Sequence, residues 1–191
     1  MLDLQYFASV REKHAAYESS RREVIKMASD ALNASKRAIF ALHRDDASAA
    51  DQLLSDASAA LDKVRALISK IPDLVFEGSY RAALEEFVES SLYRQYLRDG
   101  NVGEVKGDHI DYEIYLGGLT DLAGEIQRRQ VRLATEGKLD EVKKCKDAIE
   151  EIIIKLLEMD LGGYLRTKFD QAKNSLRRAE EVLYETTIRR S

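Results

Sequence analysis

Apolar residues return every three or four positions along almost the whole chain, the spacing that gathers them on one face of an α-helix. This spacing predicts six helices, over residues 8–44, 45–71, 80–99, 111–136, 139–160 and 164–189. The first of them carries a stripe of small and apolar residues, Val24, Ala28, Ala31, Ser35, Ala38 and Leu42. No segment alternates apolar and polar residues as a half-buried strand does. The pattern therefore predicts an all-α fold in which residues 1–191 form a single-domain helical bundle.

Residues that favour helix ends punctuate this pattern. Asp45 and Asp46 stand where a carboxylate could cap the start of the second helix, and Ser79 stands before the third. Pro72 cannot continue a helix, so it is expected to end the second one. Gly137 follows the fourth helix, where a glycine readily takes the left-handed conformation that closes a helix. Further glycines mark a loop between the third and fourth helices, at positions 100, 103 and 107.

The composition indicates a folded protein of the cytoplasm. The chain has 191 residues, of which 45% are hydrophobic and 34% charged, so it can bury one sizeable core. A single cysteine, Cys145, excludes a disulfide within the chain and a cysteine-rich zinc site, which fits a reducing compartment. The longest apolar run, residues 38–42, is too short to span a membrane, as is the isoleucine run at 152–154, and the first residues show no secretory signal. We therefore expect a cytoplasmic protein without a membrane partner.

The net charge of −4 hides an uneven distribution of charged residues. Residues 8–44 carry eight Lys and Arg against four Asp and Glu, and residues 164–191 carry seven against four. The segment between them carries 15 basic and 25 acidic residues. Two basic ends around an acidic middle fit a polyanion-binding surface near an acidic metal site. On charge alone, the favoured explanation is that these charges only solvate the outer faces of the helices.

Two pairs of acidic residues are the candidates for chemistry. Glu86 and Glu89 are three positions apart and Asp121 and Glu125 are four apart, so each pair shares one face of its helix. We expect the two pairs to meet across a helix–helix contact and to hold a divalent cation. Ligation by carboxylates alone suits Mg²⁺ or Mn²⁺, which can polarise a phosphodiester and activate water. By spacing alone, a solvated helix face is the favoured explanation of these pairs, because acids three or four positions apart occur on many helices.

Three glycines inside the fourth predicted helix support a close approach near the second pair. Gly117, Gly118 and Gly124 each cost about 1 kcal/mol relative to alanine within a helix. That cost is expected to be offset where another helix or a ligand comes close to the backbone. The neighbouring Leu122 and Ile126 are predicted to face the core.

Other chemistries that helical proteins use find less support. A ferritin-like di-iron bundle needs Glu-x-x-His on two helices, and none of His14, His43 and His109 follows a glutamate by three positions. His14 is expected on the surface and His109 in a loop. No local signature of a nucleophilic triad and no phosphate-binding glycine loop is present.

Four stretches, in the same order along the chain, resemble the translin family, and within it the branch of translin-associated factor X. They are SKRAIFALHR at residues 35–44, LEEFVE at 84–89, DYEIYLGGLTDLAGE at 111–125 and RAEEVLYETTIR at 178–189. The resemblance implies an all-α fold of about seven helices that binds single-stranded RNA and DNA and assembles into hollow octamers. The loop at residues 100–108 is short beside the insertions of eukaryotic relatives.

For the acidic residues, the resemblance implies a metal-dependent endoribonuclease site. Glu86 and Glu89 fall on the family's Glu-x-x-Glu, and Asp121 and Glu125 on its Asp-x-x-x-Glu, so these four would be the catalytic residues and the ligands of Mg²⁺ or Mn²⁺. Glu85 is adjacent but about 100° round the helix, so we leave it out of the predicted site. Translin itself lacks the full acidic set. Homo-octamers and hetero-oligomers with a translin-like subunit both remain open.

The partner predicted for this site is single-stranded RNA, with single-stranded DNA as a second class. Basic residues of the first helix, namely Arg21, Lys36, Arg37 and Arg44, are predicted to hold its phosphates. Two alternatives stay open, a shell that binds nucleic acid without cleaving it and a purely structural helical assembly. Metal-dependent cleavage would distinguish the endoribonuclease from both alternatives. Salt-sensitive binding of single strands would distinguish the binding shell from the purely structural assembly.

Overall fold

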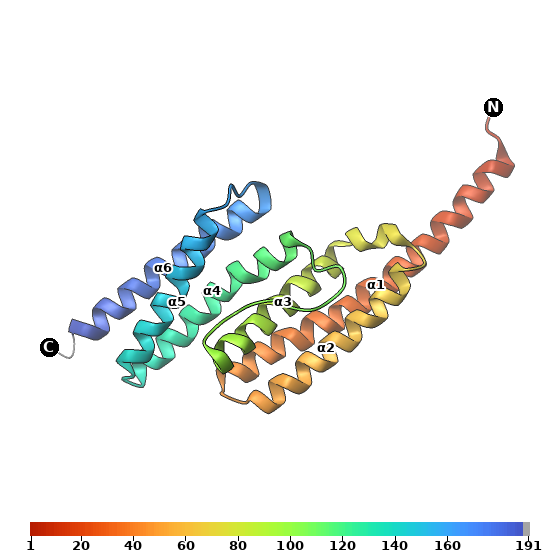
Figure 1. The fold of residues 1–191 in the computed structure, drawn as a ribbon. Helices are drawn as coiled ribbons and strands as arrows, with labels where there is room; N and C mark the ends of the chain where they lie inside the picture. Colours follow the sequence, from red (N-terminus) through yellow and green to blue (C-terminus); the bar gives the residue numbers. More distant parts are fainter. Residues whose placement is uncertain (189–191) are drawn as a thin grey trace.

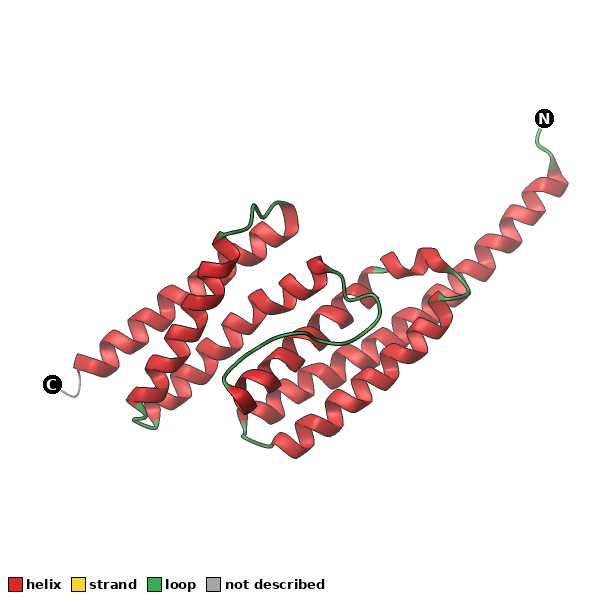
Figure 2. Cartoon of the chain, viewed as in Figure 1, coloured by secondary structure: helices red, strands yellow, loops and turns green. Residues whose placement is uncertain are grey.

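The computed structural model describes residues 1–188, and these residues form α-helices and one short 3-10 helix without any strand (Figures 1 and 2). The elements are α1 (Leu4–His43), α2 (Ala47–Ile68), η1 (Pro72–Phe76), α3 (Gly78–Asp99), α4 (Tyr112–Thr135), α5 (Leu139–Leu157) and α6 (Gly163–Ile188). The predicted all-α fold is confirmed, and residue 189, where the last predicted helix ended, lies outside the described part. No helix within residues 1–188 is long and apolar enough to cross a membrane.

The helices pack as two groups of three that share one core. α1, α2 and α3 contact one another, α4, α5 and α6 do the same, and α3 packs on α4 to join the groups (Figure 1). Buried apolar side chains from all six helices form one continuous cluster. The contact between α3 and α4 therefore lies at the centre of the molecule.

α3 and α4 run in the same direction, which a short connection between helices does not allow. The loop at residues 100–111 returns along the molecule and crosses α3 before α4 begins (Figure 2). At the start of both helices, Arg81 donates a 2.6 Å hydrogen bond to Glu113, and further along Glu89 lies against Gly118. The same order on both helices places the middle of α3 beside the middle of α4.

Two glycines of α4 allow this close contact, as the sequence predicted. A Cβ atom on Gly118 would lie 2.9 Å from the backbone nitrogen of Glu89, and one on Gly117 would meet the carboxylate of Glu85. Real Cβ atoms do not come so close to backbone, so α3 would have to move. The prediction is wrong for Gly124, where a Cβ would make an ordinary 3.9 Å contact with the Ser175 hydroxyl.

The predicted helix ends are confirmed at two places and wrong at a third. Asp46 caps α2 by accepting a 3.0 Å hydrogen bond from the backbone N–H of Ala49. Gly137 follows α4 in the left-handed conformation, with φ of +75°. Ser79 is not a cap, because α3 already begins at Gly78 and the cap position is Glu77.

Other boundaries shift for identifiable local reasons. α1 begins at Leu4 rather than residue 8, because the Asp3 carboxylate accepts hydrogen bonds from two backbone N–H groups of the first turn. α2 ends at Ile68 rather than residue 71, and the chain turns into η1 at Pro72. α5 ends at Leu157 rather than residue 160. Met159 was predicted to belong to the apolar stripe of this helix, but it is 45% exposed and lies outside the core.

The first part of α1 extends as a single helix beyond the rest of the molecule (Figure 1). The first residue of α1 that packs against the core is Tyr17, so about three and a half turns of helix precede this contact. Along them Leu4, Tyr6, Phe7 and Val10 are exposed. Isolated helices of this length are marginally stable in water, so this arm favours contact with another molecule.

Candidate functional site

The two acidic pairs meet where α3 packs on α4, as the sequence predicted. Glu86 and Glu89 come from α3, and Asp121 and Glu125 come from α4. The negative charges of Asp121 and Glu125 act on both glutamates of α3, which places all four within electrostatic reach of one another. We call Glu86, Glu89, Asp121 and Glu125 the acidic site.

Glu89 is the most deeply buried member of the acidic site. Its residue is only 8% exposed, and burial, followed by the charges of Asp121, Glu86 and Glu125, raises its pKa to about 9. Burial also raises the pKa of Glu86 and that of Asp121 above their ordinary values. The protein therefore keeps carboxyl groups together where their ionised forms are costly, which is typical of functional sites.

A lysine that the sequence analysis did not single out balances part of this charge. Lys168 of α6 donates a hydrogen bond to the Asp121 carboxylate and lies 2.7 Å from Oε1 of Glu85. Although burial alone would lower the pKa of Lys168, its bonds to Asp121 and Glu85 raise it. A second ammonium group, that of the exposed Lys36, lies 3.8 Å from Oε2 of Glu86.

A histidine from the end of α1 holds Glu125. The imidazole of His43 contacts the Glu125 carboxylate through Nε2, and its Nδ1 lies 3.2 Å from the hydroxyl of Tyr93. Burial raises the pKa of Tyr93 strongly, so its phenol stays protonated and donates to Nδ1. The Nε2–H of His43 is thereby directed at Glu125.

The donor set fits Mg²⁺ or Mn²⁺, although the side chains do not form a ready ligand group. Within residues 1–188, no three His, Cys, Asp or Glu side chains are grouped so that they could hold a metal ion. Asp121 bonds to Lys168 and Glu125 to His43 instead. Mg²⁺ and Mn²⁺ nevertheless prefer carboxylate oxygens as ligands, and a bound cation would compensate the buried negative charge of these four side chains. The predicted metal site thus stays a prediction, and it requires Asp121 to exchange Lys168 for the ion.

The four basic residues predicted to hold phosphates do not form one surface. Arg21 donates a 2.7 Å hydrogen bond to Glu77, and Arg44 is exposed roughly 35 Å further along α1. Arg37 lines a different cavity, of about 760 Å³, between α1 and α2. Lys36 alone of the four lies beside the acidic site.

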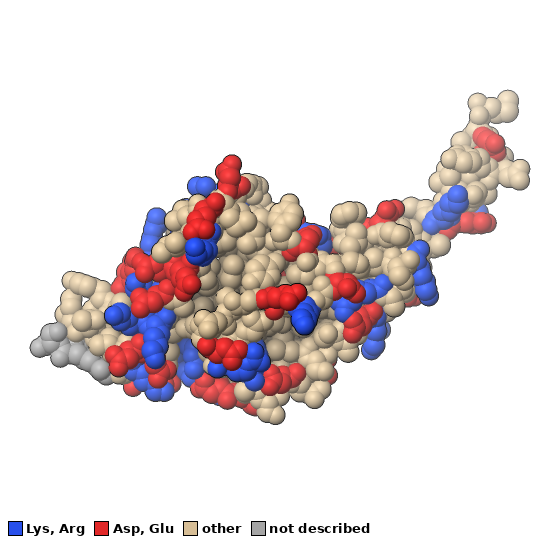
Figure 3. Space-filling model, viewed as in Figure 1, with Lys and Arg blue, Asp and Glu red and all other residues tan. Residues whose placement is uncertain are grey.

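The surface mixes charges of both signs. On the face drawn in Figure 3, Lys and Arg are interspersed with Asp and Glu. Across the described residues, many charged side chains form ion pairs, such as the 2.7 Å contact between Arg94 and Asp51. The uneven charge along the sequence therefore does not become two separate surfaces on this face. A phosphate backbone would meet local groups of cations.

An open cleft gives access to the acidic site. It has a volume of about 540 Å³ and lies against α1, α3, α4 and α6. Its walls include Lys36, Glu86 and Asp121, together with Tyr164 and Lys168 of α6. Cations, carboxylates and an aromatic ring converge here, the mixture expected of a site that handles a charged ligand.

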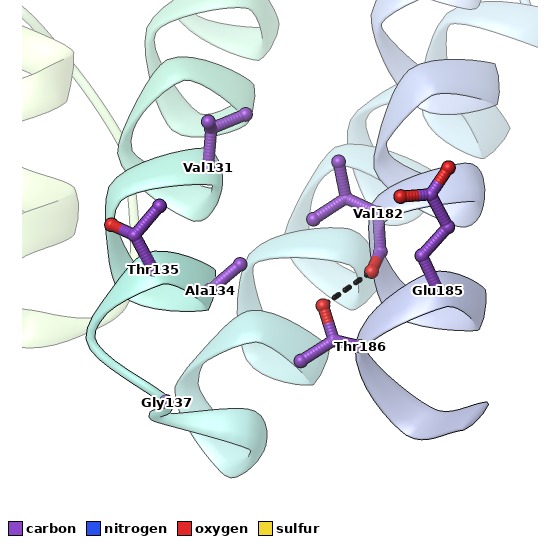
Figure 4. Close-up of a pocket in the computed structure, with 7 residues that line it drawn as sticks. All are labelled: Val131, Ala134, Thr135, Gly137, Val182, Glu185 and Thr186. Atoms are coloured by element: carbon purple, nitrogen blue, oxygen red, sulfur yellow. Dashed lines mark hydrogen bonds between the residues drawn. The ribbon is translucent and has the colours of Figure 1, made fainter. Parts of the chain in front are cut away.

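A second cavity offers no comparable chemistry. Figure 4 shows it between the C-terminal ends of α4 and α6, with Val131 and Ala134 facing Val182. The Thr186 hydroxyl already donates a 2.6 Å hydrogen bond to the carbonyl oxygen of Val182. Among residues 1–188, Glu185 is its one charged wall residue. We therefore take the cleft at the acidic site as the functional site.

Replacing Glu89 by Gln is expected to stabilise the metal-free protein by about 1–3 kcal/mol near pH 8. The folded pKa of about 9 exceeds the ordinary 4.5, so the folded state binds more protons between these values and the free energy of unfolding falls as pH rises. Glutamine removes that loss. Below pH 4.5 the gain should vanish, because the carboxyl is then protonated in both states.

Thermal unfolding in EDTA at pH 4 and pH 8 measures this effect. The Gln variant should melt above wild type at pH 8 and beside it at pH 4. A lower melting temperature of the variant at pH 8 would show that the buried carboxylate is compensated by a group other than a metal.

Comparisons with known proteins agree with this architecture. The model of the translin family matches residues 19–190. Translin of Homo sapiens and of Bos taurus are each 34% identical to the chain over 86 residues, and translin of Gallus gallus is 33% identical over the same length. These matches cover 44% of this chain and 37% of each relative, so the chain matches well under half of the length of these curated relatives.

Solved structures share the fold over nearly the whole chain. The crystal structure of apo-NeC3PO gives a TM-score of 0.84 at 24% sequence identity, covering 97% of this chain and 98% of that one. The complex of AfC3PO with duplex RNA gives 0.87 at 22% identity with the same coverage. The helical arrangement described above is thus a known fold.

Proposed function

Because this chain belongs to the translin family, we propose that it binds single-stranded RNA within an oligomeric helical shell and cleaves it as a metal-dependent endoribonuclease of the cytoplasm. The observation that carries the proposal is the acidic site, where the buried Glu89 and its neighbour Glu86 on α3 meet Asp121 and Glu125 of α4. The complex of AfC3PO with duplex RNA supports RNA as the partner of this fold. Single-stranded DNA is the second substrate class to test.

Each residue of the site has a task in this proposal. Glu86, Glu89, Asp121 and Glu125 would hold Mg²⁺ or Mn²⁺, and the ion would polarise the phosphodiester and activate water. His43 orients Glu125 through its Nε2–H. Lys36 lies at the rim of the cleft beside Glu86, where a phosphate group of the RNA would reach it first.

A non-catalytic shell that binds nucleic acid is the second candidate. Its support is that Asp121 and Glu125 already have protein partners, and that no ready ligand group exists among residues 1–188. In this alternative the acids serve structure and the surrounding cations bind phosphates.

Incubation with a labelled circular RNA separates the two candidates. Such an RNA has no ends, so only internal cleavage converts it to a linear product. The endoribonuclease should linearise it in Mg²⁺ or Mn²⁺ and leave it intact in EDTA. Retention of the circle under all three conditions, together with tight binding, would establish the binding shell instead.

Binding of single-stranded RNA should weaken steeply with salt. Each phosphate that the protein neutralises releases counterions, so contact with about five phosphates would lower the affinity roughly 100-fold between 50 and 200 mM salt. Lys36→Ala should reduce this slope, because Lys36 lies at the rim of the cleft. Arg21→Ala is the control, since Glu77 already occupies that guanidinium. An affinity that stays flat across this range would contradict the electrostatic account.

The native mass in solution should be a multiple of 21.6 kDa, and about eight times that value if the shell is an octamer of this chain alone. The exposed arm of α1 supports assembly, because Phe7 and Val10 are 51% and 41% exposed among the described residues 1–188. Light scattering measures the mass, and the double variant Phe7→Asp, Val10→Asp should lower it. A 21.6 kDa monomer at all concentrations would exclude a homo-oligomer.

A further inference from the structure

Glu85, which the sequence analysis set aside, occupies a specific position beside the acidic site. Its carboxylate lies against Gly117 of α4, where a Cβ atom would come within 2.6 Å of the Glu85 carboxyl carbon. The hydroxyl of Tyr164 donates a 2.6 Å hydrogen bond to the same carboxylate. Glu85 is thus seated by two other helices, and any side chain at position 117 would displace it.

This seated carboxylate holds Lys168. The ammonium group lies 2.7 Å from Glu85 Oε1 and 5.5 Å from the centre of the Tyr164 ring, and it also bonds to Asp121. The Lys168 side chain is 15% exposed, whereas those of Lys36 beside Glu86 and Arg128 beside Glu125 are each 52% exposed. Lys168 therefore has two carboxylate partners, and only Asp121 of these belongs to the acidic site.

We propose that Lys168 is the internal counter-ion of the acidic site, which balances the acids in the metal-free protein and releases Asp121, while staying on Glu85, when a divalent cation binds. The release of Asp121 on binding of the cation rests on the proposed function, which supplies the metal site. This inference makes Lys168 a positioning residue, and it gives Glu85, Gly117 and Tyr164 the common task of retaining the displaced ammonium group.

The physical reason is competition between like charges. An ammonium group on Asp121 and a divalent cation on the same carboxylate repel each other at short range. A lysine with no second partner would have to leave for solvent, or it would keep the metal out. Glu85 removes this conflict, because Lys168 already bonds to it and needs to give up only one of its two contacts.

Two results are expected from the variant Lys168→Met, which keeps the bulk of the side chain and removes its charge. The metal-free protein should melt several degrees lower, since Asp121 and Glu85 lose their partner. The affinity for Mn²⁺ should rise about tenfold, because the ion no longer competes with an ammonium group. The two effects have opposite signs, which simple damage to the fold would not produce.

Lys173→Met is the matched control. Lys173 lies on the same helix and pairs with Asp170 at the surface, at 2.6 Å. Melting curves in EDTA and the EPR signal of free Mn²⁺ measure stability and affinity for both variants and wild type. The control should match wild type in both measurements. If Lys168→Met fails to fold, Lys168→Gln removes the charge while keeping a hydrogen-bond donor.

The outcomes separate this inference from the proposed function. An Mn²⁺ affinity that is unchanged or weaker in the folded Lys168 variant, with normal binding by wild type, overturns the role of Lys168 alone. If wild type and both lysine variants all fail to bind Mn²⁺, the release of Asp121 by Lys168 is overturned together with the proposed metal site. A tighter affinity with a lower melting temperature in EDTA supports the proposal.

Discussion

Replacement of Glu89 by Gln, or of Asp121 by Asn, is expected to slow RNA cleavage at least about 100-fold while RNA binding survives. Each amide keeps the shape of the side chain and removes the charge that a divalent cation needs. Binding should persist, because on this proposal cations at the rim of the cleft and elsewhere would hold the phosphates. It should even tighten slightly, since one carboxylate fewer repels the phosphate.

Cleavage and binding must be measured side by side on assembled protein. Glu150→Gln is the matched control, because Glu150 is an α5 residue that pairs with Lys146 outside the acidic site. The control should cut RNA at the wild-type rate. If both acidic-site variants also cut at that rate in Mg²⁺ or Mn²⁺, the acids are not the catalytic centre and the binding shell becomes the better account.

The second large effect concerns stability. Gly118→Ala is expected to lower the free energy of unfolding by about 2–3 kcal/mol. Its Cβ would lie 2.7 Å from Val88 Cγ1 and 2.9 Å from the backbone nitrogen of Glu89, so α3 must shift away from α4. Because this shift moves Glu89 relative to Asp121, cleavage should fall as well.

Gly124→Ala in the same helix is the control for this effect. Its Cβ would make only a 3.9 Å contact with the Ser175 hydroxyl, so the gain in helix propensity, up to about 1 kcal/mol, should appear as added stability. Chemical denaturation of both variants measures the difference. Equal stability of the two would contradict the close α3–α4 contact on which the site depends.

Periodicity was sufficient to predict that the described chain is built of helices and which of their faces are apolar. The 3.6-residue repeat reports which face of each helix is apolar, so Leu122 and Ile126 were correctly placed in the core. The glycines at 117 and 118 indicated a close approach, because only a tight contact offsets their cost in a helix. Spacing and resemblance together thus predicted where α3 and α4 would meet.

Periodicity could not predict the partners that come from distant helices. Lys168 and Asp121 are 47 positions apart, and His43 and Glu125 are 82 positions apart, so no local repeat relates them. The parallel course of α3 and α4 was also missed, because repeat patterns report faces and not directions. Glu85 was set aside for its angle on α3, yet Lys168 reaches it from α6. Each miss concerns a contact that only the packing of helices creates.

Titration of Mn²⁺ into the metal-free protein, followed by the EPR signal of free Mn²⁺, tests most directly whether the acidic site holds a divalent cation. Wild type should remove Mn²⁺ from solution in a saturable manner, and Asp121→Asn should lose most of this capacity while keeping its helical content and mass. Equal uptake of Mn²⁺ by the two proteins, or no uptake by wild type, would contradict the central claim.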